Sequence, residues 1–310
     1  MVVEFCGLSE RSIRTVKTNE RDLSISLDLG LRQKMIELLG ITKYYGNIKA
    51  LDNLSLHIDK GCIFGLLGPN GAGKTTTIKI LTALTRQDSG TCLIDGYDIN
   101  EYPILVKSKI AVVPQENNLD RELTVYDNLK IYGMLYGVKD LDKIIMNNLK
   151  KVGLEDKTNT LVTKLSGGMQ RRLLLVRALM REPSILFLDE PSIGLDPQIR
   201  RSIWDIIRLT RHEGRTVVIT THYIEEADAL CDKIAILSKG RLIALDTPEK
   251  LKAMIGKYVV EYVDKDGKII RSIKNNKFEA EKYANLQSAN LTIRESNLED
   301  VFIELTGERI

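Results

Sequence analysis

The sequence predicts an α/β protein with a mixed central sheet, a helical subdomain and a small C-terminal α+β extension. Three observations support this fold class. From residue 35 to residue 246, continuously apolar segments that are typical of buried strands recur between helical segments. Between residues 121 and 160 the apolar residues follow a helical spacing. Beyond Pro248 short strand-like segments and a final helix replace this pattern.

The composition limits the class of protein. Of the 310 residues, 43% are hydrophobic and 28% charged, which is ordinary for a soluble globular chain. The net charge of +3 arises from 45 basic and 42 acidic residues, so charge gives no reason to expect a nucleic-acid partner. The cysteines Cys6, Cys62, Cys92 and Cys231 are widely spaced, so we expect buried reduced thiols rather than a zinc cluster or a disulfide framework.

The boundaries of the predicted parts follow changes of pattern along the chain. Residues 1–34 show no sustained periodicity and lack the apolar core of a signal peptide, so they are either a flexible extension or the product of a wrongly assigned upstream start codon. We assign the main domain to residues 35–246, with its helical subdomain at about 116–165, and an accessory domain to residues 247–310. No apolar run approaches ~18 to 20 residues, so we expect a cytoplasmic protein that does not span a bilayer.

The first strands lead directly into a phosphate-binding motif. Residues 35–39 and 53–58 read as strands, and 62–67 as a buried central strand. The next segment, 68–75, matches G-x-x-x-x-G-K-[ST], and residues 74–84 read as a helix. A glycine loop between a strand and a helix directs backbone N–H groups at an anion, and the helix N-terminus adds partial positive charge. We therefore expect Lys74 to reach the outer phosphate of a nucleotide and Thr75 to hold Mg²⁺.

Two amphipathic helices are predicted between residues 121 and 160. We interpret most of their apolar residues as core rather than as partner contacts. The residues of this apolar face are Val125, Leu129, Tyr132 and Tyr136 in the first helix and Ile145, Leu149 and Val152 in the second.

Two further buried strands end in polar residues. Residues 184–188 precede Asp189 and Glu190, and residues 216–221 precede His222. Because ligands collect beyond the carboxyl ends of parallel strands, these residues and the glycine loop are expected to form one pocket. We assign Asp189 to Mg²⁺ and Glu190 to the base that accepts a proton from the attacking water.

Other polar residues carry a weaker signal. Gln115 ends an apolar run, where it could reach Mg²⁺ and the attacking water, although a solvated loop residue would look the same. His222 could donate to the terminal phosphate, although a lone histidine is more often structural. The segment Ser166-Gly167-Gly168 opens a helix with a hydroxyl and free amides, which suits a phosphate. The chain already has a phosphate loop, and one nucleotide needs only one such cradle from one subunit, so this second cradle implies two subunits.

The C-terminal segment is predicted to form a small unit. Residues 258–263 and 268–273 read as a hairpin around a turn at 264–267. Ser296 and Glu299 have the spacing of a capping box, which predicts a final helix that ends at Gly307. Its packing face is expected to contain Leu298, Val301, Phe302 and Leu305.

Together these motifs resemble the nucleotide-binding subunits of ABC transporters over about residues 35–246. The resemblance implies a P-loop NTPase fold of ABC type, with ATP and Mg²⁺ as cofactors. By this resemblance Ile185 to Asp189 is the Walker B segment and Ser192 to Asp196 the D-loop. It implies catalytic roles for Lys74, Gln115, Glu190 and His222 and metal contacts for Thr75, Gln115 and Asp189. The resemblance also implies contacts with ATP, in which Tyr45 would stack on adenine. The other implied contacts are the Walker A residues Gly68, Pro69, Asn70, Gly71, Ala72, Gly73, Lys74, Thr75 and Thr76 and the signature residues Ser166, Gly167, Gly168 and Gln170.

The resemblance also implies partners. In the family two ATPase domains dimerise head to tail, and each ATP lies between one Walker A and the other subunit's signature. We expect a homodimer bound to separate integral membrane permease subunits on the inner face of the cell membrane, with the helical insertion and the segment around Gln115 at the permease contact. Residues 115–120, 191–197 and 297–302 look most like daunorubicin-resistance-type exporter subunits, although Ser192 stands where threonine is usual.

Two alternatives share this pocket. A non-transporter ABC ATPase acting on ribosomes or DNA would usually carry two ATPase halves or a long coiled coil, whereas this chain has one motif set. A nucleotide-binding regulator without turnover would not need Glu190 and His222. We therefore expect an ATP-hydrolysing subunit of an exporter of drug, lipid or other hydrophobic cargo.

Overall fold

The computed structural model describes residues 33–264, 267–286 and 291–307. The chain divides into two units, residues 1–33 and 34–310, and the second contains every element below. Apart from residues 33 and 34, the predictions for 1–34 lie outside the described residues, as does part of the predicted turn at 264–267.

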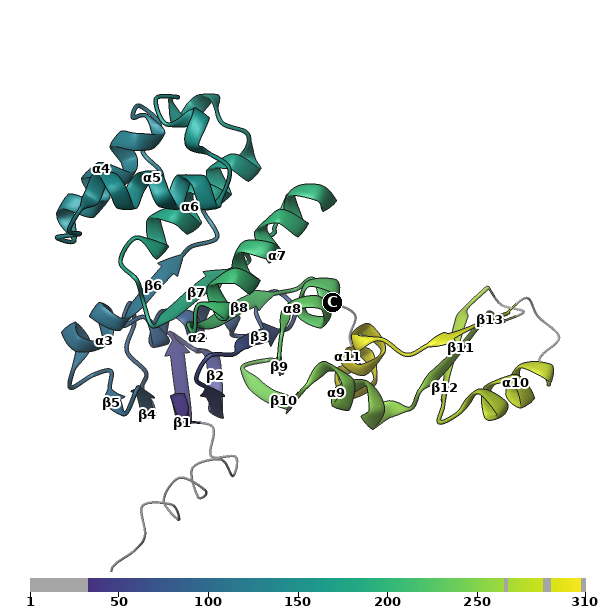
Figure 1. Cartoon of the computed structure of the whole chain (residues 1–310). Coiled ribbons are helices and arrows are strands. Elements are labelled where there is room, and N and C mark those ends of the chain that lie inside the picture. The colour runs from purple at the N-terminus through teal and green to yellow at the C-terminus, as the bar shows by residue number, and fades with distance from the viewer. Residues whose placement is uncertain (1–32, 265–266, 287–290, 308–310) are drawn as a thin grey trace, which may run out of the picture. The chain divides into compact units, whose positions relative to one another are not determined.

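A six-stranded sheet forms the centre of this unit (Figure 1). Five neighbouring strands run parallel and the edge strand β10 is antiparallel to β9, so the prediction of a mixed central sheet is confirmed. In spatial order the strands are β10 (Arg241–Asp246), β9 (Lys233–Ser238), β3 (Ile63–Leu67), β8 (Thr216–Thr221), β7 (Ile185–Asp189) and β6 (Ile110–Val113).

The register of this sheet determines where the site forms. Leu67 at the end of β3 pairs with Thr221 of β8, and Thr220 pairs with Asp189 of β7. The loops that follow these three strands therefore leave the sheet at one edge. Every residue of β3, β7 and β8 is buried, as their continuous apolar runs predict.

A four-stranded antiparallel sheet packs beside the central sheet through a shared apolar cluster that includes Ile36, Leu54 and Phe64. In spatial order its strands are β2 (Ile48–Asp59), β1 (Lys34–Tyr45), β4 (Ser89–Ile94) and β5 (Tyr97–Asp98). Both β1 and β2 run further than the segments predicted at 35–39 and 53–58, because a hydrophobic pattern alone does not show where pairing continues.

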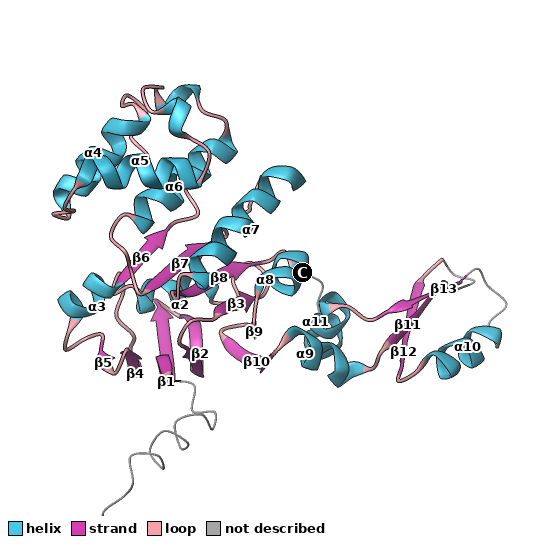
Figure 2. Cartoon of the chain, in the orientation of Figure 1, coloured by secondary structure: helices cyan, strands magenta, loops and turns pink. Residues whose placement is uncertain are grey.

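The two helices of the predicted insertion, α4 and α5, pack against each other and against α6, which follows the insertion (Figure 2). Residues 74–84 were expected to form one helix, but α2 ends at Leu81, and Ala83 has a left-handed φ of 51°. The helices of the main domain are α2 (Lys74–Leu81), α3 (Pro103–Lys109), α4 (Val125–Leu135), α5 (Leu141–Lys151), α6 (Gly167–Leu179), α7 (Pro197–His212) and α8 (Ile224–Leu230), with short 3₁₀ turns η1 (Glu155–Lys157) and η2 (Val162–Lys164). None of the helices among the described residues is long and apolar enough to cross a bilayer.

The predicted hairpin near the C-terminal end is confirmed as β11 paired with β12, and a third strand, β13, pairs on the other edge of β11. One face of this sheet packs on α10 through Val260, Ala280 and Ala284. In contrast, Phe302 of α11 belongs to the same apolar cluster as Leu230 of α8. These elements are α9 (Pro248–Ile255), β11 (Tyr258–Val263), β12 (Ile269–Lys274), α10 (Lys277–Asn285), β13 (Leu291–Glu295) and α11 (Leu298–Thr306).

The capping box of the last helix was predicted one residue too early. Asn297, not Ser296, caps α11, because its side chain accepts from the Asp300 amide while the Asp300 side chain accepts from the Asn297 amide. Ser296 instead donates its hydroxyl to the Gly256 carbonyl at 2.6 Å. The prediction for Leu305 was also wrong, since this residue is exposed.

Asp300 also binds the neighbouring strand. Arg294 of β13 donates to its two carboxylate oxygens at 2.6 and 2.7 Å. Burial raises the pKa of Asp300, but the hydrogen bonds from Arg294 and the Asn297 amide outweigh it, so the pKa lies below its ordinary value of 3.8.

The three cysteines within the described residues are buried and unbonded, which confirms the prediction for them. Burial raises the pKa of the Cys62 thiol to about 11 and that of Cys92 to about 12. Cys231 is buried in the same way, and its pKa is also raised. Cys6 lies outside the described residues.

Candidate nucleotide-binding and hydrolysis site

The phosphate loop connects β3 to α2, as predicted. A Cβ on Gly68 would lie 2.4 Å from the Leu237 carbonyl oxygen, so only glycine fits there without a backbone shift. Gly73, the N-cap of α2, has a φ of 102°, which a residue with a Cβ rarely adopts. No side chain caps α2, so its first amides remain available to an anion. The loop therefore has the backbone that a phosphate cradle requires.

Lys74 lies buried at the base of this loop, with 5% of its surface exposed. Its ammonium donates to the Gly68 carbonyl at 2.7 Å and to the Pro69 carbonyl at 3.2 Å. It also lies 3.4 Å from Glu190 Oε1. Since carbonyl oxygens carry only partial charge, an entering phosphate would be a stronger partner for this cation.

Glu190 and His222 meet directly, although they are far apart in sequence. The Glu190 carboxylate is buried, and its Oε2 lies in direct contact with His222 Nδ1. Glu190 has a φ of 50°, a strained value for a non-glycine residue, and its amide donates to both the carbonyl and the hydroxyl of Thr220 at 3.1 Å. These bonds hold the carboxylate at the end of β7, between Lys74 and His222.

The predicted oxygen donors differ in exposure. Asp189 is buried, and its carboxylate accepts from the Thr220 hydroxyl. Thr75 at the start of α2 and Gln115 after β6 are exposed, and Thr76 is half-buried. A carboxylate, a hydroxyl and an amide oxygen are the donor types that Mg²⁺ accepts, so this set suits the ion.

Arg171 connects the loops of the site and was not singled out from the sequence. Its buried guanidinium donates to the carbonyls of Asp189, Glu190 and Pro191 at distances from 2.9 to 3.1 Å. It also donates to Pro114 at 2.6 Å and to Gln115 at 3.4 Å. Its position one residue after Gln170, at the start of a largely apolar helix, was the only sequence signal.

The signature segment begins α6. Ser166 is its exposed N-cap, and its side chain accepts from the Met169 amide at 3.3 Å. Gly167 is exposed, whereas a Cβ on Gly168 would lie 2.4 Å from Ile199 of α7, so this end of α6 packs closely on α7. Gln170 donates to the Val162 and Leu165 carbonyls at 3.1 Å, so its amide holds the signature loop.

The remaining predicted contacts lie on the rim of the loop or at the end of a strand. Tyr45 ends β1 and is exposed, with the Lys43 ammonium 5.6 Å from its ring centre. Asn70 and Gly71 are exposed and Pro69 is half-buried, while Ala72 is buried. The structure thus brings Lys74, Asp189, Glu190 and His222 together and leaves Tyr45 and the loop tip open to solvent.

Comparison with known proteins agrees with this geometry. The family described as ABC transporter matches residues 51–193. The chain is 38% identical over 297 residues to the Nod factor export ATP-binding protein I of Paraburkholderia xenovorans, covering 89% of this chain and 98% of that protein.

Solved structures show the same fold. The ATP-binding subunit of an ABC transporter matches with a TM-score of 0.68 and 24% identity, over 88% of this chain and 99% of that one. An ATP-binding cassette solved as a dimer in a post-hydrolysis state, bound to ADP and phosphate, matches with a TM-score of 0.62 and 29% identity, over 69% of this chain and 98% of that one.

Proposed function

This chain belongs to the ATP-binding subunits of ABC transporters, and from that premise we propose that it drives export through separate permease subunits. It binds ATP and hydrolyses it, as this family does. The Nod factor relatives are exporters by name, which supports the direction of transport. Within the family, we propose that the chain is of the daunorubicin-resistance type, because the segments around Gln115, Ser192 and Asn297 resemble that type. We also propose that the cargo is hydrophobic.

The observation that carries the catalytic proposal is the buried cluster of Lys74, Glu190 and His222. Glu190 acts as the base that accepts a proton from the attacking water, because it is the carboxylate nearest to Lys74 at the phosphate loop. His222 contacts this carboxylate and donates a hydrogen bond to the terminal phosphate, to which Lys74 offers its positive charge. Asp189, whose carboxylate accepts from the Thr220 hydroxyl, takes no part in the proposed proton transfer.

We propose that Thr75, Asp189 and Gln115 hold Mg²⁺. Magnesium bound there would neutralise charge on the phosphates, which is its usual contribution to phosphoryl transfer. The exposed Tyr45 is proposed to stack on adenine, and the rest of the loop, Asn70 to Thr76, to contact the phosphates through its backbone and hydroxyls.

A second ATPase subunit completes the proposed site. Ser166 and Gly167 are exposed at the N-terminus of α6 and so present a hydroxyl and free amides to another molecule. The dimeric cassette with bound ADP and phosphate supports an arrangement of two subunits. We propose a homodimer in which Ser166 of one subunit and Lys74 of the other bind the same ATP.

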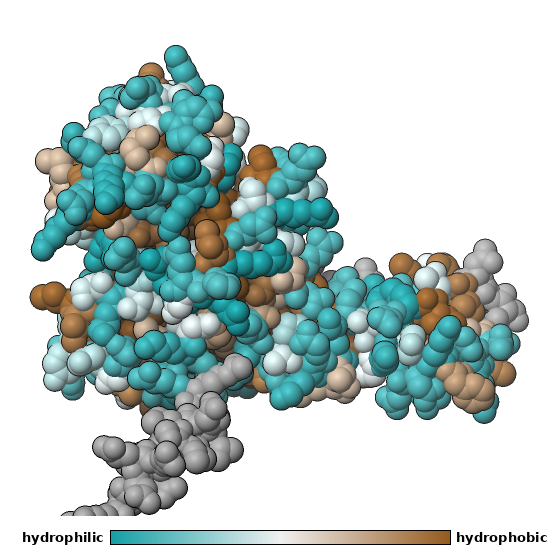
Figure 3. Space-filling view, in the orientation of Figure 1, coloured by the Kyte–Doolittle hydropathy of each residue, from teal (hydrophilic) through white to brown (hydrophobic). Residues whose placement is uncertain are grey.

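A groove of about 730 Å³ between α3, α4 and α6 fits the proposed permease contact. Its lining includes Ile104, Tyr132, Tyr136 and Arg177, and Ile104 has 85% of its surface exposed. Figure 3 shows hydrophobic surface near α3 and along the base of the helical segment. An apolar surface of this kind is typical of a protein contact, and docking there would hold the subunit at the inner face of the membrane.

We also propose the division of the chain into domains. Residues 35–246 form the ATPase domain, with the helical subdomain at about 116–165 as its permease-facing part. Residues 247–310 form an accessory domain, of which α9 and α11 share the apolar core of the ATPase domain.

Replacing Glu190 tests the catalytic assignment. In the purified full-length chain, Glu190→Gln is expected to lower ATP turnover by about 10²-fold or more, because the amide cannot accept the proton. Binding of a fluorescent ATP analogue is expected to stay within a few-fold of wild type. Turnover at the wild-type rate in the Glu190→Gln variant would mean that another group is the base.

A further inference from the structure

One buried carboxylate has no role in the proposed hydrolysis. Glu226 of α8 has 0% of its surface exposed. Its Oε1 accepts from the Ser192 hydroxyl and from the Trp204 indole N–H, the latter at 3.1 Å. Burial raises the pKa of Glu226, while hydrogen bonds from Ser192, Thr221 and Trp204 oppose that shift. An acid in this position is costly to bury, so its hydrogen bonds are its main compensation.

The two hydrogen-bond partners of Glu226 Oε1 come from the segment before α7 and from α7 itself. Ser192 lies two residues after Glu190, in the segment between β7 and α7. Glu226 itself lies four residues after His222, and Thr221 is the residue before His222. One carboxylate therefore joins the backbone that follows the proposed base to the helix that follows the proposed histidine.

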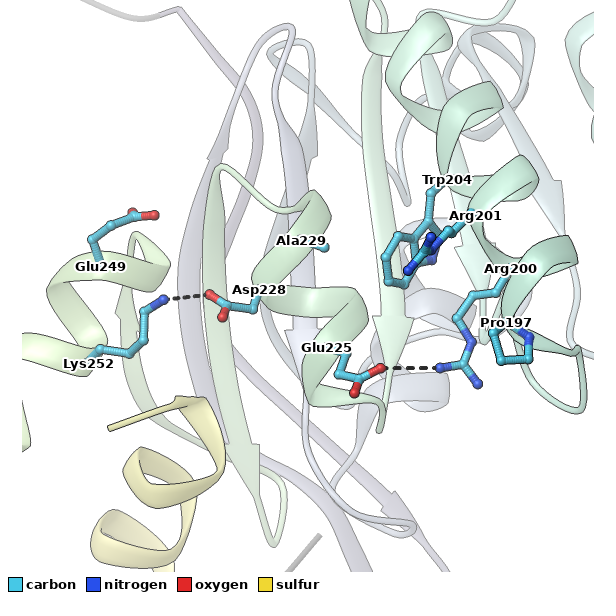
Figure 4. Close-up of a pocket in the computed structure, with 9 residues that line it drawn as sticks. All are labelled: Pro197, Arg200, Arg201, Trp204, Glu225, Asp228, Ala229, Glu249 and Lys252. Atoms are coloured by element: carbon cyan, nitrogen blue, oxygen red, sulfur yellow. Dashed lines mark hydrogen bonds and ion pairs between the residues drawn. The ribbon is translucent and has the colours of Figure 1, made fainter. Parts of the chain in front are cut away.

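The contact between α7 and α8 is weaker on the outer side of these helices. A cavity of about 620 Å³ opens between α7, α8 and α9, and Figure 4 shows Arg200 and Trp204 projecting from α7 and Glu225 from α8 beside it. Arg200 and Glu225 pair at 3.6 Å, and Glu225 is 84% exposed, so solvent weakens this pair. The buried bonds of Glu226 are therefore the stronger connection between the two helices.

We propose that Glu226 is a positioning residue for ATP hydrolysis, which holds the Ser192 segment and the His222 segment in fixed relation. It acts through Ser192 and does not touch the nucleotide. This inference rests on the proposed roles of Glu190 and His222. Because it sets the geometry of the base and not of the phosphate loop, its loss is expected to change turnover more than ATP affinity.

The test compares four single variants of the full-length chain and the double variant Ser192→Ala/Glu226→Ala. Ser192→Ala and Glu226→Ala each remove the bond between the two segments, and Glu226→Gln keeps an oxygen acceptor for Ser192 and Trp204. Glu225→Gln is the matched control, because it changes the neighbouring exposed glutamate of the same helix. The measurements are kcat, the Kd of a fluorescent ATP analogue and the thermal midpoint.

Trp204 provides an independent spectroscopic readout, because it is the only tryptophan of the chain. Its indole N–H also lies 3.3 Å from the Ser192 hydroxyl oxygen. Glu226→Ala is expected to shift the tryptophan emission, whereas Glu225→Gln is not. The emission thus reports whether the buried bonds are altered in each variant before turnover is compared.

We expect Ser192→Ala and Glu226→Ala to lower kcat about tenfold each with Kd within about twofold, and the double variant to lose little more than either. Glu226→Gln is expected to regain most of the turnover. Wild-type kcat in a folded Ser192→Ala protein overturns the inference, as does a multiplicative loss in the double variant. A loss of kcat that is fully explained by a smaller fraction of folded protein overturns the inference too.

The same assay distinguishes this inference from the proposal that Glu190 is the catalytic base. If Glu190→Gln abolishes turnover while Ser192→Ala leaves it unchanged, the catalytic assignment stands and the positioning role of Glu226 is wrong. If Glu190→Gln retains turnover, the base was misassigned. Should Glu226→Ala not fold, Ser192→Ala alone decides, because it removes only one hydroxyl.

Discussion

Replacing Arg171 by methionine is expected to destabilise the chain strongly and to disorder the site. The guanidinium, 7% exposed, donates five hydrogen bonds to backbone carbonyls of two separate segments, residues 114–115 and 189–191. Burial lowers the pKa of Arg171 to about 10, so the group still carries its charge at neutral pH. Methionine fills a similar volume but can donate to none of these oxygens.

The loss of stability in Arg171→Met depends on the carbonyl oxygens that are left without a donor. A hydrogen bond from a charged donor contributes about 1.5–3 kcal/mol, and a buried acceptor without a partner costs about 1–3 kcal/mol. Five bonds from one group are not additive, because they share a single desolvation cost. Leaving two or more of these buried carbonyl oxygens without a donor, at about 1–3 kcal/mol each, gives an expected loss of about 3–5 kcal/mol in the free energy of unfolding. For a domain of this size that is roughly 6–20 °C in Tm.

Urea unfolding followed by circular dichroism measures this loss, with Arg172→Met as the control. Arg172 is next in sequence and half-buried, and it donates to the Val152 carbonyl at 2.6 Å. Its replacement is expected to cost about 1.5 kcal/mol, the low end for a charged donor, because Arg172 is only half-buried. Equal destabilisation by the two variants, or a loss below about 1 kcal/mol for Arg171→Met, would refute the idea that this arginine holds the two segments together.

Three further predictions concern other parts of the molecule. Gly68→Ala is expected to weaken ATP binding at least tenfold, measured with a fluorescent analogue, because its Cβ would lie 2.4 Å from a backbone carbonyl. Gly71→Ala has a strained φ of 82° but open space around its Cβ, so it is expected to weaken ATP binding less. Phe302→Ala is expected to cost about 3–5 kcal/mol in urea unfolding, whereas the exposed Phe278→Ala costs under ~0.5 kcal/mol. Asp300→Asn is expected to cost about 1–3 kcal/mol at pH 7. Because the folded pKa of Asp300 lies below 3.8, this difference should be constant well above that pH and shrink as the pH falls through the folded pKa.

Each of these three has an outcome that contradicts it. Equal ATP affinities for the two glycine variants would show that the loop backbone moves freely. Similar losses for Phe302→Ala and Phe278→Ala would show that α11 is not part of the main core. A stability difference for Asp300→Asn that stays constant down to the lowest pH at which the protein folds would show that its charge does not stabilise the helix.

Strands β3, β7 and β8 of the central sheet were predictable because they are buried on both faces. Residues such as Phe64, Leu186 and Val218 give these strands uninterrupted apolar runs. A short run of this kind between glycine or proline residues is typical of a buried strand. The ends of elements were less predictable. Neighbouring residues such as Ser296 and Asn297 are both good N-caps, and only tertiary contacts, here the bond from Ser296 to Gly256, decide between them.

The site could be predicted where a motif lies at the end of a strand. Lys74, Glu190 and His222 come together as expected, because the order of the strands brings their loops to one edge. Arg171 and Glu226 could not be found in the same way. Their importance comes from burial against segments far away in sequence, and a charged residue within a helix is usually exposed.

The buried thiols have a practical consequence for labelling the chain. A thiol reacts as its thiolate, and Cys62 and Cys92, with pKa values of about 11 and 12, are almost wholly protonated at neutral pH as well as shielded from reagents. Once Cys6 is replaced, a cysteine introduced at the exposed Ser166 would therefore react selectively with a maleimide dye or cross-linker. Such a cross-linker would test the proposed contact between two subunits without removing the internal cysteines.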